Sequence, residues 1–413
     1  MIERVVQPHN LQKAIKQIVA NKGSAGVDGI TTKQMVEHIG THKAQLLAAV
    51  MGNNYLPQPI LGVEIPKANG KKRLLGVPTT TDRVLQQAVA QAIAPLYEPD
   101  FSRNSYGFRP GKNARQAVGQ SRDYIHQGYN HIVDIDLKSF FDEVNHCLLL
   151  NLLHKKVKCK STMRVIRKWL RAPIQIKGKL HKRRKGVPQG SPLSPLLSNI
   201  LLNELDKEMT RQGLKFVRYA DDFSVYCKRA SQARSVARTL IHFLKTKLDL
   251  TINEEKSGIR KPVNFNLLGF GFVPTYKKGS KNQYQLVVSE KAWKTLKQRL
   301  KRITRKTSPI PLQERLSRIL EIQRGWLNYF RGASIQGKLK ALDGWLRNRL
   351  RYCIWHHWKK PERKRKNLIR LGVDQDHAYA WSRSRKGGWA IAQSPILGTT
   401  ITEQRLKKRG YQS

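Results

Sequence analysis

The spacing of apolar residues divides the chain into four stretches with different expected structures. Residues 1–60 have helical spacing broken by a glycine-rich loop, and residues 61–115 carry short apolar runs separated by turn residues. Residues 116–275 alternate strand-like and helix-like patterns, whereas residues 290–413 are helical and rich in Lys and Arg. This order predicts an α+β core followed by a helical module.

Individual elements can be placed from the same patterns, using apolar periodicity together with turn and capping residues. The expected elements are a hairpin turn at 68–70, helices at 81–93, 193–209 and 290–306, and strands at 131–135, 216–219 and 223–226. The last two strands are separated by only three residues, so they predict a second hairpin.

Acidic residues gather at the ends of these predicted strands. Asp221 and Asp222 lie at the short turn of the second hairpin, and Asp136 follows the strand at 131–135, with Asp134 two residues before it. Adjacent carboxylates repel each other unless a cation neutralises them. Three carboxylates in this arrangement are typical of a two-Mg²⁺ site for nucleotidyl transfer, whereas an Asp-Asp pair alone is more often a solvated turn.

The net charge indicates a polyanionic partner. The chain has 78 Lys and Arg against 28 Asp and Glu, a formal net charge of +50. Such self-repulsion gives a globular fold no advantage, so binding is the natural explanation. Because the basic residues run along the whole chain, nucleic acid is favoured over a membrane surface.

The rest of the composition favours a soluble protein in a reducing compartment. Four cysteines are present without CxxC spacing, so neither a disulfide framework nor a zinc knuckle is expected. No apolar stretch is long enough to span a bilayer, and the first residues lack an apolar signal segment. We therefore expect a cytoplasmic location without membrane association.

Sequence blocks around the carboxylates resemble those of reverse transcriptases encoded by bacterial group II introns. The segment 218–222 reads RYADD and resembles the YxDD signature, and 133–142 (VDIDLKSFFD) resembles the block with the first catalytic aspartate. Further matches, in the family's order, are YGFRPG at 106–111, GVPQGSPLSP at 186–195, NEEKS at 253–257, LLGF at 267–270 and RGWLNYF at 324–330. Ser191 departs from the pattern, because intron enzymes often have Gly there.

This resemblance implies a right-hand polymerase fold: fingers, a palm with an antiparallel catalytic hairpin, a helical thumb and a small basic DNA-binding segment. The expected boundaries are 1–60 for an N-terminal extension of the fingers, 61–285 for fingers and palm, 286–345 for the thumb or maturase X domain, and 346–413 for the DNA-binding segment. It also implies that Asp136, Asp221 and Asp222 bind two Mg²⁺ ions and carry the catalysis.

Residues expected by resemblance to contact the incoming dNTP are Lys67, Arg73, Phe141, Gln189 and Lys256. The first two cations would neutralise the triphosphate, the aromatic ring would exclude a ribose 2′-hydroxyl, and Lys256 would protonate the leaving pyrophosphate. The alternatives are that these cations are merely exposed and that Phe141 is a core residue, as expected for Phe140.

Contacts with template, primer and other nucleic acid are expected at three places. Residues Gly23, Ser24, Ala25 and Gly26 of the N-terminal loop would lie against the template through backbone amides, unless they form a plain interhelical loop. Template or primer contacts are also expected at Arg109, Gly190 and Tyr219. Sequence-independent phosphate contacts are expected from Lys294, Lys297, Arg363, Lys364, Arg365 and Lys366. The aromatic residues of 324–330 are expected mainly to be packing anchors.

The implied function is an RNA-directed DNA polymerase that extends a primer with dNTPs, binds its own group II intron RNA to assist splicing, and copies that RNA at a DNA target. Nothing resembles the H-N-H endonuclease of many intron proteins, which is typical of subgroup IIC and of some other subgroups. Two alternatives are a domesticated intron-like enzyme in DNA repair or phage defence, and an RNA-binding splicing factor without polymerase activity. The intact aspartates argue against the latter. The sequence gives no indication of the oligomeric state.

Overall fold

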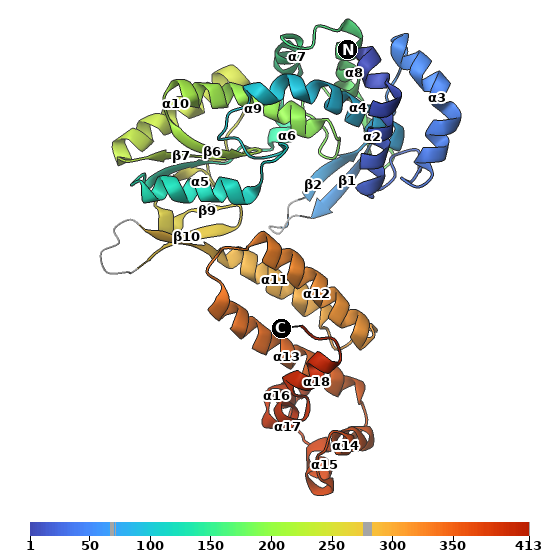
Figure 1. The fold of residues 1–413 in the computed structure, drawn as a ribbon, viewed down its shortest axis with the longest axis vertical. Coiled ribbons are helices and arrows are strands. Elements are labelled where there is room, and N and C mark those ends of the chain that lie inside the picture. The colour runs from blue at the N-terminus through green and yellow to red at the C-terminus, as the bar shows by residue number, and fades with distance from the viewer. Residues whose placement is uncertain (67–69, 71, 276–282, 413) are drawn as a thin grey trace. The chain divides into compact units, whose positions relative to one another are not determined.

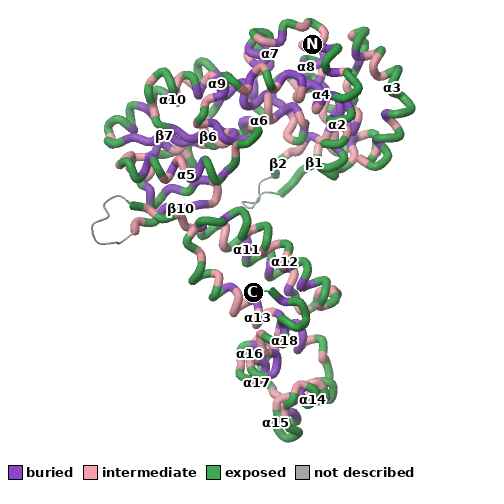
Figure 2. Tube along the Cα trace, viewed as in Figure 1, coloured by how far each residue is buried: buried purple, intermediate pink, exposed green. Residues whose placement is uncertain are grey.

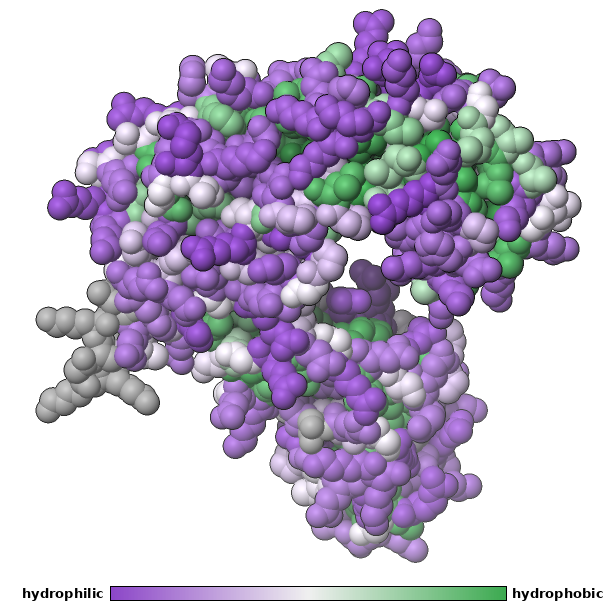
Figure 3. All heavy atoms as spheres, turned by 45° about the horizontal axis from the view of Figure 1, so that its top comes forward, coloured by the Kyte–Doolittle hydropathy of each residue, from purple (hydrophilic) through white to green (hydrophobic). Residues whose placement is uncertain are grey.

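The computed structural model describes residues 1–66, 70, 72–275 and 283–412, and the chain divides into two compact units, residues 1–261 and 262–413 (Figure 1). Within each unit the buried residues are mostly apolar. Buried residues concentrate on the strands and on the inner faces of the helices, while exposed residues cover the outer faces (Figure 2). The face shown in Figure 3 is mostly hydrophilic.

The N-terminal part of the first unit combines helices with a small mixed sheet. The helices are α1 (Ile2–Val6), α2 (Pro8–Ala20), α3 (Met35–Met51), α4 (Thr80–Tyr97), η1 (Glu98–Asp100), α7 (His146–His154) and α8 (Lys160–Arg171). The sheet has the order β2-β1-β4-β5 and consists of β1 (Ile60–Pro66), β2 (Lys72–Val77), β4 (Ile174–Ile176) and β5 (Lys179–His181). Strands β1 and β2 form an antiparallel hairpin, and β1 also pairs with β4 in parallel.

A larger antiparallel sheet carries the predicted carboxylates. Its order is β6-β7-β3-β8, with β3 (His131–Ile135), β6 (Lys215–Tyr219), β7 (Asp222–Cys227) and β8 (Gly258–Arg260). Helices α5 (Ala114–His126), α9 (Ser194–Arg211) and α10 (Ala230–Leu248) pack against it, and the short α6 (Phe140–Glu143) follows β3 (Figure 1). Apolar side chains such as Val133, Phe216 and Val225 are at most 1% exposed, so packing on the helices fixes the strand register.

The second unit has a three-stranded antiparallel sheet followed by helices. The short 3-10 helix η2 (Pro262–Asn264) precedes the sheet, whose strands are β9 (Asn266–Leu267), β10 (Phe270–Pro274) and β11 (Tyr284–Val288), in the order β11-β10-β9. Its helices are α11 (Glu290–Ile303), α12 (Leu312–Tyr329), α13 (Gln336–His357), α14 (Pro361–Arg370), α15 (Gln375–Ser382), α16 (Gly388–Gln393), α17 (Pro395–Thr400) and α18 (Glu403–Lys408). They share one apolar core, which includes Leu300, Leu346 and Leu350.

Most of the elements expected from the sequence are present with shifted ends. The strand at 131–135 is confirmed, as are the hairpin β6–β7 and helix α9. Helix α4 is longer than expected because Thr79 caps its first turn and Tyr97 remains buried in its last turn. Helix α11 ends at Ile303, before the expected 306. Residues 68 and 69 of the expected first turn lie outside the described residues.

Aromatic residues of the 324–330 block pack within the second unit, as expected. The Trp326 ring lies 4.6 Å from Trp293 and 4.7 Å from Phe330, and Phe330 is 5% exposed. Tyr329 differs, because it is 41% exposed and donates to the Leu268 carbonyl.

No helix in the described parts of the chain has the length and apolar character needed to cross a bilayer.

Candidate active site

Two neighbouring strands bring three aspartates to one end of the larger sheet. In the antiparallel pairing of β3 with β7, Ile135 lies opposite Phe223. Continuing this register by one residue places Asp136 opposite Asp222, the first residue of β7, and Asp221 precedes it in the turn from β6. The pairing of β3 with β7 therefore brings together the carboxylates singled out from the sequence.

The turn between β6 and β7 has a constrained backbone. Ala220 is buried and has a φ of +58°, in the left-handed region that residues other than glycine rarely adopt. Gly107 packs directly on this turn, because a Cβ atom on it would lie 2.2 Å from the Ala220 nitrogen. The close approach explains why the 106–111 block has a glycine at this position.

The carboxylates repel one another around this turn. Desolvation, followed by the charges of Asp221, Asp136 and Asp134, raises the pKa of Asp222 to about 6. Desolvation is also the main cause that raises the pKa of Asp221, and the charge of Asp136 adds to it. The Asp222 side chain keeps contact with solvent, so water screens part of the repulsion. A divalent cation would relieve it further.

Asp136 is fixed by the segment 253–257. Its carbonyl accepts a hydrogen bond from the Asn253 N–H at 2.7 Å, and its own N–H donates to Ser257 Oγ at 3.0 Å. Its Oδ2 atom lies 3.0 Å from Asn253 Nδ2 and 3.1 Å from Lys256 Nζ. Of these residues only Lys256 was predicted from the sequence, although the NEEKS block was a signal for Asn253 and Ser257 as well.

The donor chemistry of this site suits a hard divalent cation, since Mg²⁺ prefers carboxylate oxygens. Within the described part of the chain, however, no three His, Cys, Asp or Glu side chains are gathered closely enough to hold a metal ion. Asp136 Oδ2 is engaged by the Lys256 ammonium and the Asn253 side-chain amide. The carboxylates fit Mg²⁺ by type and by mutual repulsion, and the Lys256 ammonium neutralises one of them.

The loop with Gln189 and Gly190 crosses strand β2. The Gln189 carbonyl accepts a hydrogen bond from the Gly76 N–H at 3.0 Å. Gly190 has a φ of +131°, and a Cβ atom on it would lie 2.6 Å from the Gly76 carbonyl oxygen, so a side chain is excluded there. Ser191 is buried and donates to Gln86 Oε1 at 2.9 Å, so its hydroxyl has an internal partner.

Phe140 and Phe141 have different environments. Phe140 is 2% exposed, which confirms the prediction of a core residue, whereas Phe141 is only partly buried at the edge of that core. The Phe141 carbonyl accepts from the Val187 N–H at 2.7 Å, which joins the segment after Asp136 to the loop at 186–191. The role of Phe141 in sugar selection stays a prediction.

Of the two cations expected at the triphosphate, Lys67 lies outside the described residues. Arg73 is exposed on β2, opposite Ile65 of β1. Although desolvation raises the pKa of Asp221, the charge of Arg73 acts in the opposite direction. The guanidinium is therefore within electrostatic reach of the carboxylates.

The comparisons with known proteins agree with this geometry. The family model for reverse transcriptase (RNA-dependent DNA polymerase) matches residues 65–272, which is half of the chain. The chain belongs to the reverse transcriptase family. The model for the group II intron maturase-specific domain matches residues 293–372, so the chain combines a polymerase region with a region typical of intron maturases.

Two curated relatives and one solved structure are similar to this reverse transcriptase. Protein YkfC of Escherichia coli (strain K12) is 29% identical over 63% of this chain and 78% of its own length. Group II intron-encoded protein LtrA of Lactococcus lactis subsp. cremoris is 34% identical over 52% of this chain, but the match spans only 36% of LtrA. A partial Cas6-RT-Cas1–Cas2 complex superimposes with a TM-score of 0.39 at 27% identity, over 60% of this chain and 42% of that chain.

In this reverse transcriptase the N-terminal loop packs against α4. A Cβ atom at Gly23 would lie 2.5 Å from Arg83 Nη1, and one at Gly26 would lie 2.7 Å from Thr79 Cα. Arg83 also donates to the Ser24 carbonyl at 2.5 Å. Close packing against backbone atoms accounts for Gly26, whereas the atom near Gly23 is the end of the Arg83 side chain. A template contact by this loop stays a prediction.

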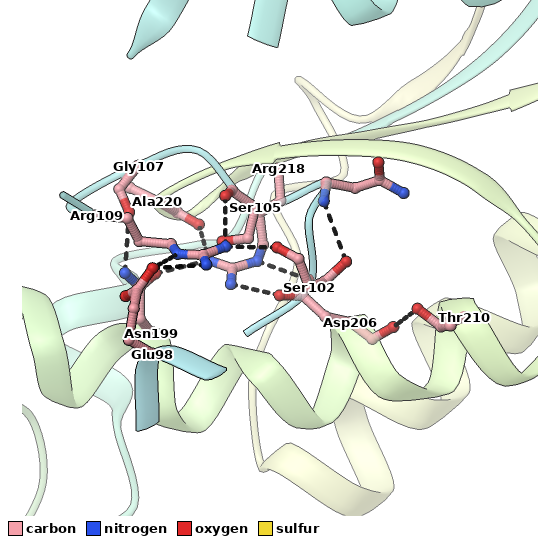
Figure 4. A network of polar contacts seen from close by, with 11 residues as sticks. Glu98, Ser102, Ser105, Gly107, Arg109, Asn199, Asp206, Thr210, Arg218 and Ala220 are labelled. Carbon is pink, nitrogen blue, oxygen red and sulfur yellow. Dashed lines mark hydrogen bonds and ion pairs between the residues drawn. The ribbon is translucent and has the colours of Figure 1, made fainter. Parts of the chain in front are cut away.

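A template contact was expected for Arg109 from the sequence, but in the structure its side chain binds groups of the protein itself. Its side chain is 7% exposed, and its Nε and Nη2 atoms lie 2.9 and 2.7 Å from Glu98 Oε1. Its Nη1 donates to the carbonyls of Ser102 and Ser105 at 2.5 and 2.9 Å (Figure 4). Each of the three guanidinium nitrogens therefore has a partner within the protein. Tyr219, in contrast, is partly exposed at the end of β6, beside the carboxylates.

The candidate phosphate-binding cations of the second unit fall into two groups. Lys294 and Lys297 are exposed on α11, with Lys297 Nζ 5.1 Å from the centroid of the Trp345 ring. In the basic run of α14, Lys364 lies 4.5 Å from the centroid of the Trp355 ring, and Arg365 forms an ion pair within its own helix.

The other two cations of this run, Arg363 and Lys366, are exposed. They are therefore the members of the run that are accessible to a phosphate backbone.

Proposed function

We propose that this reverse transcriptase copies RNA into DNA at a site formed by Asp136, Asp221 and Asp222. The observation that carries the proposal is the β3–β7 register, which brings together carboxylates that are far apart in the sequence. Desolvation, followed by the charges of the neighbouring carboxylates, raises the pKa of Asp222. Two bound Mg²⁺ ions would relieve the repulsion between these carboxylates.

When bound, the Mg²⁺ ions would activate the primer 3′-hydroxyl and neutralise the triphosphate. Asp136, Asp221 and Asp222 would hold them. The Lys256 ammonium lies 3.1 Å from Asp136 Oδ2, and its side chain is 63% exposed. From this place beside the carboxylates Lys256 would serve as the proton donor to the leaving pyrophosphate.

The groups around the carboxylates supply the expected selectivity for dNTPs. Arg73 lies on the hairpin β1–β2 within electrostatic reach of Asp221, so its guanidinium would neutralise the incoming triphosphate, together with Lys67. The partly exposed Phe141 would exclude the ribose 2′-hydroxyl. Gln189 and Gly190, held against β2, would contact the nascent base pair.

A second activity is supported by the match of residues 293–372 to the maturase-specific domain and by the net charge of +50. We infer that the protein binds a group II intron RNA, assists its splicing, and copies it from a primer at a DNA target. Lys294, Lys297, Arg363 and Lys366 are the exposed cations that would bind nucleic-acid phosphates there.

Primer extension tests the polymerase proposal directly. The purified full-length protein should extend an oligo(dT) primer on poly(rA) with dTTP and Mg²⁺, and Asp136→Asn should reduce the rate to background. Lys247→Gln is a matched surface control, because that side chain is exposed in the last turn of α10 and belongs to none of the blocks assigned to the site. An inactive wild-type protein that still binds the primer–template would overturn the proposal and favour a splicing factor without polymerase activity.

A further inference from the structure

An arginine at the end of β6 is buried together with a carboxylate. Arg218 and Asp206, from α9, both have fully buried side chains. The guanidinium donates from Nε to Asp206 Oδ1 at 2.7 Å and from Nη2 to Oδ2 at 2.5 Å, a two-point ion pair (Figure 4). The remaining nitrogen, Nη1, is left to contact other groups.

That nitrogen reaches the turn that carries the candidate catalytic carboxylates. Arg218 Nη1 donates to the Ala220 carbonyl at 3.0 Å and to Asn199 Oδ1 at 3.0 Å. Asn199 in turn donates from Nδ2 to the Gly107 carbonyl at 2.9 Å. The network therefore links α9, the turn and the 106–111 block, as Figure 4 shows.

The backbone of Arg218 is held from the other side. Its N–H donates to the Asn104 carbonyl at 2.9 Å, and its carbonyl accepts from the Tyr106 N–H at 2.8 Å. Gly107 then packs on the peptide that joins Tyr219 to Ala220. The turn is thus enclosed between this segment and the Arg218 side chain.

Stability alone is a weak reason for such an arrangement. Removing two charges from water is costly, and an apolar pair of similar volume is often as stable as a buried ion pair. The turn, however, needs a restraint that apolar side chains do not provide. Ala220 is in a left-handed conformation, and two adjacent carboxylates, Asp221 and Asp222, follow it, so the turn holds a conformation that is costly for a residue other than glycine.

We propose that Arg218, oriented by Asp206 and Asn199, is a positioning residue that holds the Ala220 carbonyl and thereby fixes Asp221 and Asp222 in the geometry that binds metal. This inference rests on the proposed polymerase function. The three residues touch neither substrate nor metal, and none of them was predicted from the sequence as a site residue. The signals in the sequence were the Arg of RYADD and the polar Asn199 and Asp206 beside the apolar residues of 200–205.

The test replaces the ion pair without leaving a lone buried charge. The double variant Arg218→Met with Asp206→Leu replaces the ion pair by two apolar side chains and removes both bonds of Nη1. The full-length protein should stay folded and bind poly(rA)/oligo(dT) with unchanged affinity. Its kcat for dTTP should fall by about 100-fold, the order of magnitude for a displacement of about 1 Å at a reacting centre. The KM for dTTP should change little.

A metal titration supplies a readout independent of activity. Mn²⁺ binding, followed by electron paramagnetic resonance, should be several-fold weaker in the double variant than in the wild type. Tyr226→Phe is the matched control, because it removes buried hydrogen bonds to Ser121 and Ser224 from the same sheet without touching the turn. It should keep wild-type kcat and Mn²⁺ affinity.

Three results would overturn the inference. The first is a folded double variant with wild-type kcat and Mn²⁺ affinity. The second is an equal loss of kcat and Mn²⁺ affinity in the double variant and in Tyr226→Phe. The third is a loss of the fold in both the double variant and Arg218→Lys. In Arg218→Lys the single ammonium group can still pair with Asp206, but no further nitrogen is left to donate to the Ala220 carbonyl. This variant should therefore show the same fall in kcat. A wild-type protein without polymerase activity would instead refute the proposed function itself.

Discussion

Replacement of Gly107 by alanine should disable the polymerase by crowding the carboxylate turn. An added Cβ would lie 2.2 Å from the Ala220 nitrogen and 2.9 Å from the Tyr219 carbonyl carbon. Ordinary van der Waals contact begins near 3.4 Å, so the turn or the segment around Gly107 must move by about 1 Å. Misplacement of that size costs roughly 10²-fold in rate, and overpacking costs about 1–3 kcal/mol of folding stability.

The assay compares kcat for dTTP incorporation on poly(rA)/oligo(dT), the affinity for that primer–template, and the thermal unfolding midpoint. Gly119→Ala is the matched control, because it lies in the middle of α5 with no atom within 4 Å of its new Cβ. It should leave kcat unchanged and stabilise the helix by about 0.5–1 kcal/mol. A folded Gly107→Ala protein with wild-type kcat would refute the claim that turn position controls catalysis.

Three further outcomes are expected. The pKa of Asp222 is raised from 3.8 to about 6, so the metal-free folded protein binds a proton more tightly than the unfolded chain. Its thermal unfolding midpoint should therefore fall as the pH rises from 4 to 7. The Asp222→Asn variant should show a weaker dependence of the midpoint on pH. Phe141→Val should increase incorporation of ribonucleotides relative to dNTPs by roughly 10–200-fold, the range for discrimination by pocket shape, and unchanged selectivity would identify Phe141 as a packing residue only. Arg363→Ala with Lys366→Ala should weaken DNA binding and lower the salt slope by about 1 per lost phosphate contact, whereas Lys364→Ala should mainly lower the unfolding midpoint because that side chain covers Trp355.

The sequence was sufficient to predict the elements that carry the site. Periodicity predicted β3 and the β6–β7 hairpin, because their apolar residues alternate with polar residues or form short buried runs. The resemblance of their sequence blocks predicted that Asp136, Asp221 and Asp222 share one site. The register of β3 with β7 places Asp136 opposite Asp222, in agreement with that prediction.

The environments of charged side chains were harder to predict. Arg109 and Arg218 both belong to recognisable blocks, yet one is bound to Glu98 and the other to Asp206, inside the protein. Likewise, half of the basic run of α14 is engaged by Trp355 or by an acidic neighbour. Periodicity reports which faces are apolar, but it does not report which buried acceptor a long cationic side chain reaches.

The most direct test of the account is the double variant Asp221→Asn with Asp222→Asn, assayed for DNA synthesis and for RNA binding in parallel. Asparagine keeps the shape of both side chains but removes the charge that metal binding requires. RNA binding rests on many Lys and Arg residues, against which the loss of two carboxylates is a small change. We predict no detectable primer extension, with affinity for a group II intron RNA unchanged or slightly increased. DNA synthesis by the double variant would contradict the catalytic assignment, and the joint loss of synthesis and RNA binding in a folded protein would contradict the separation of the two functions.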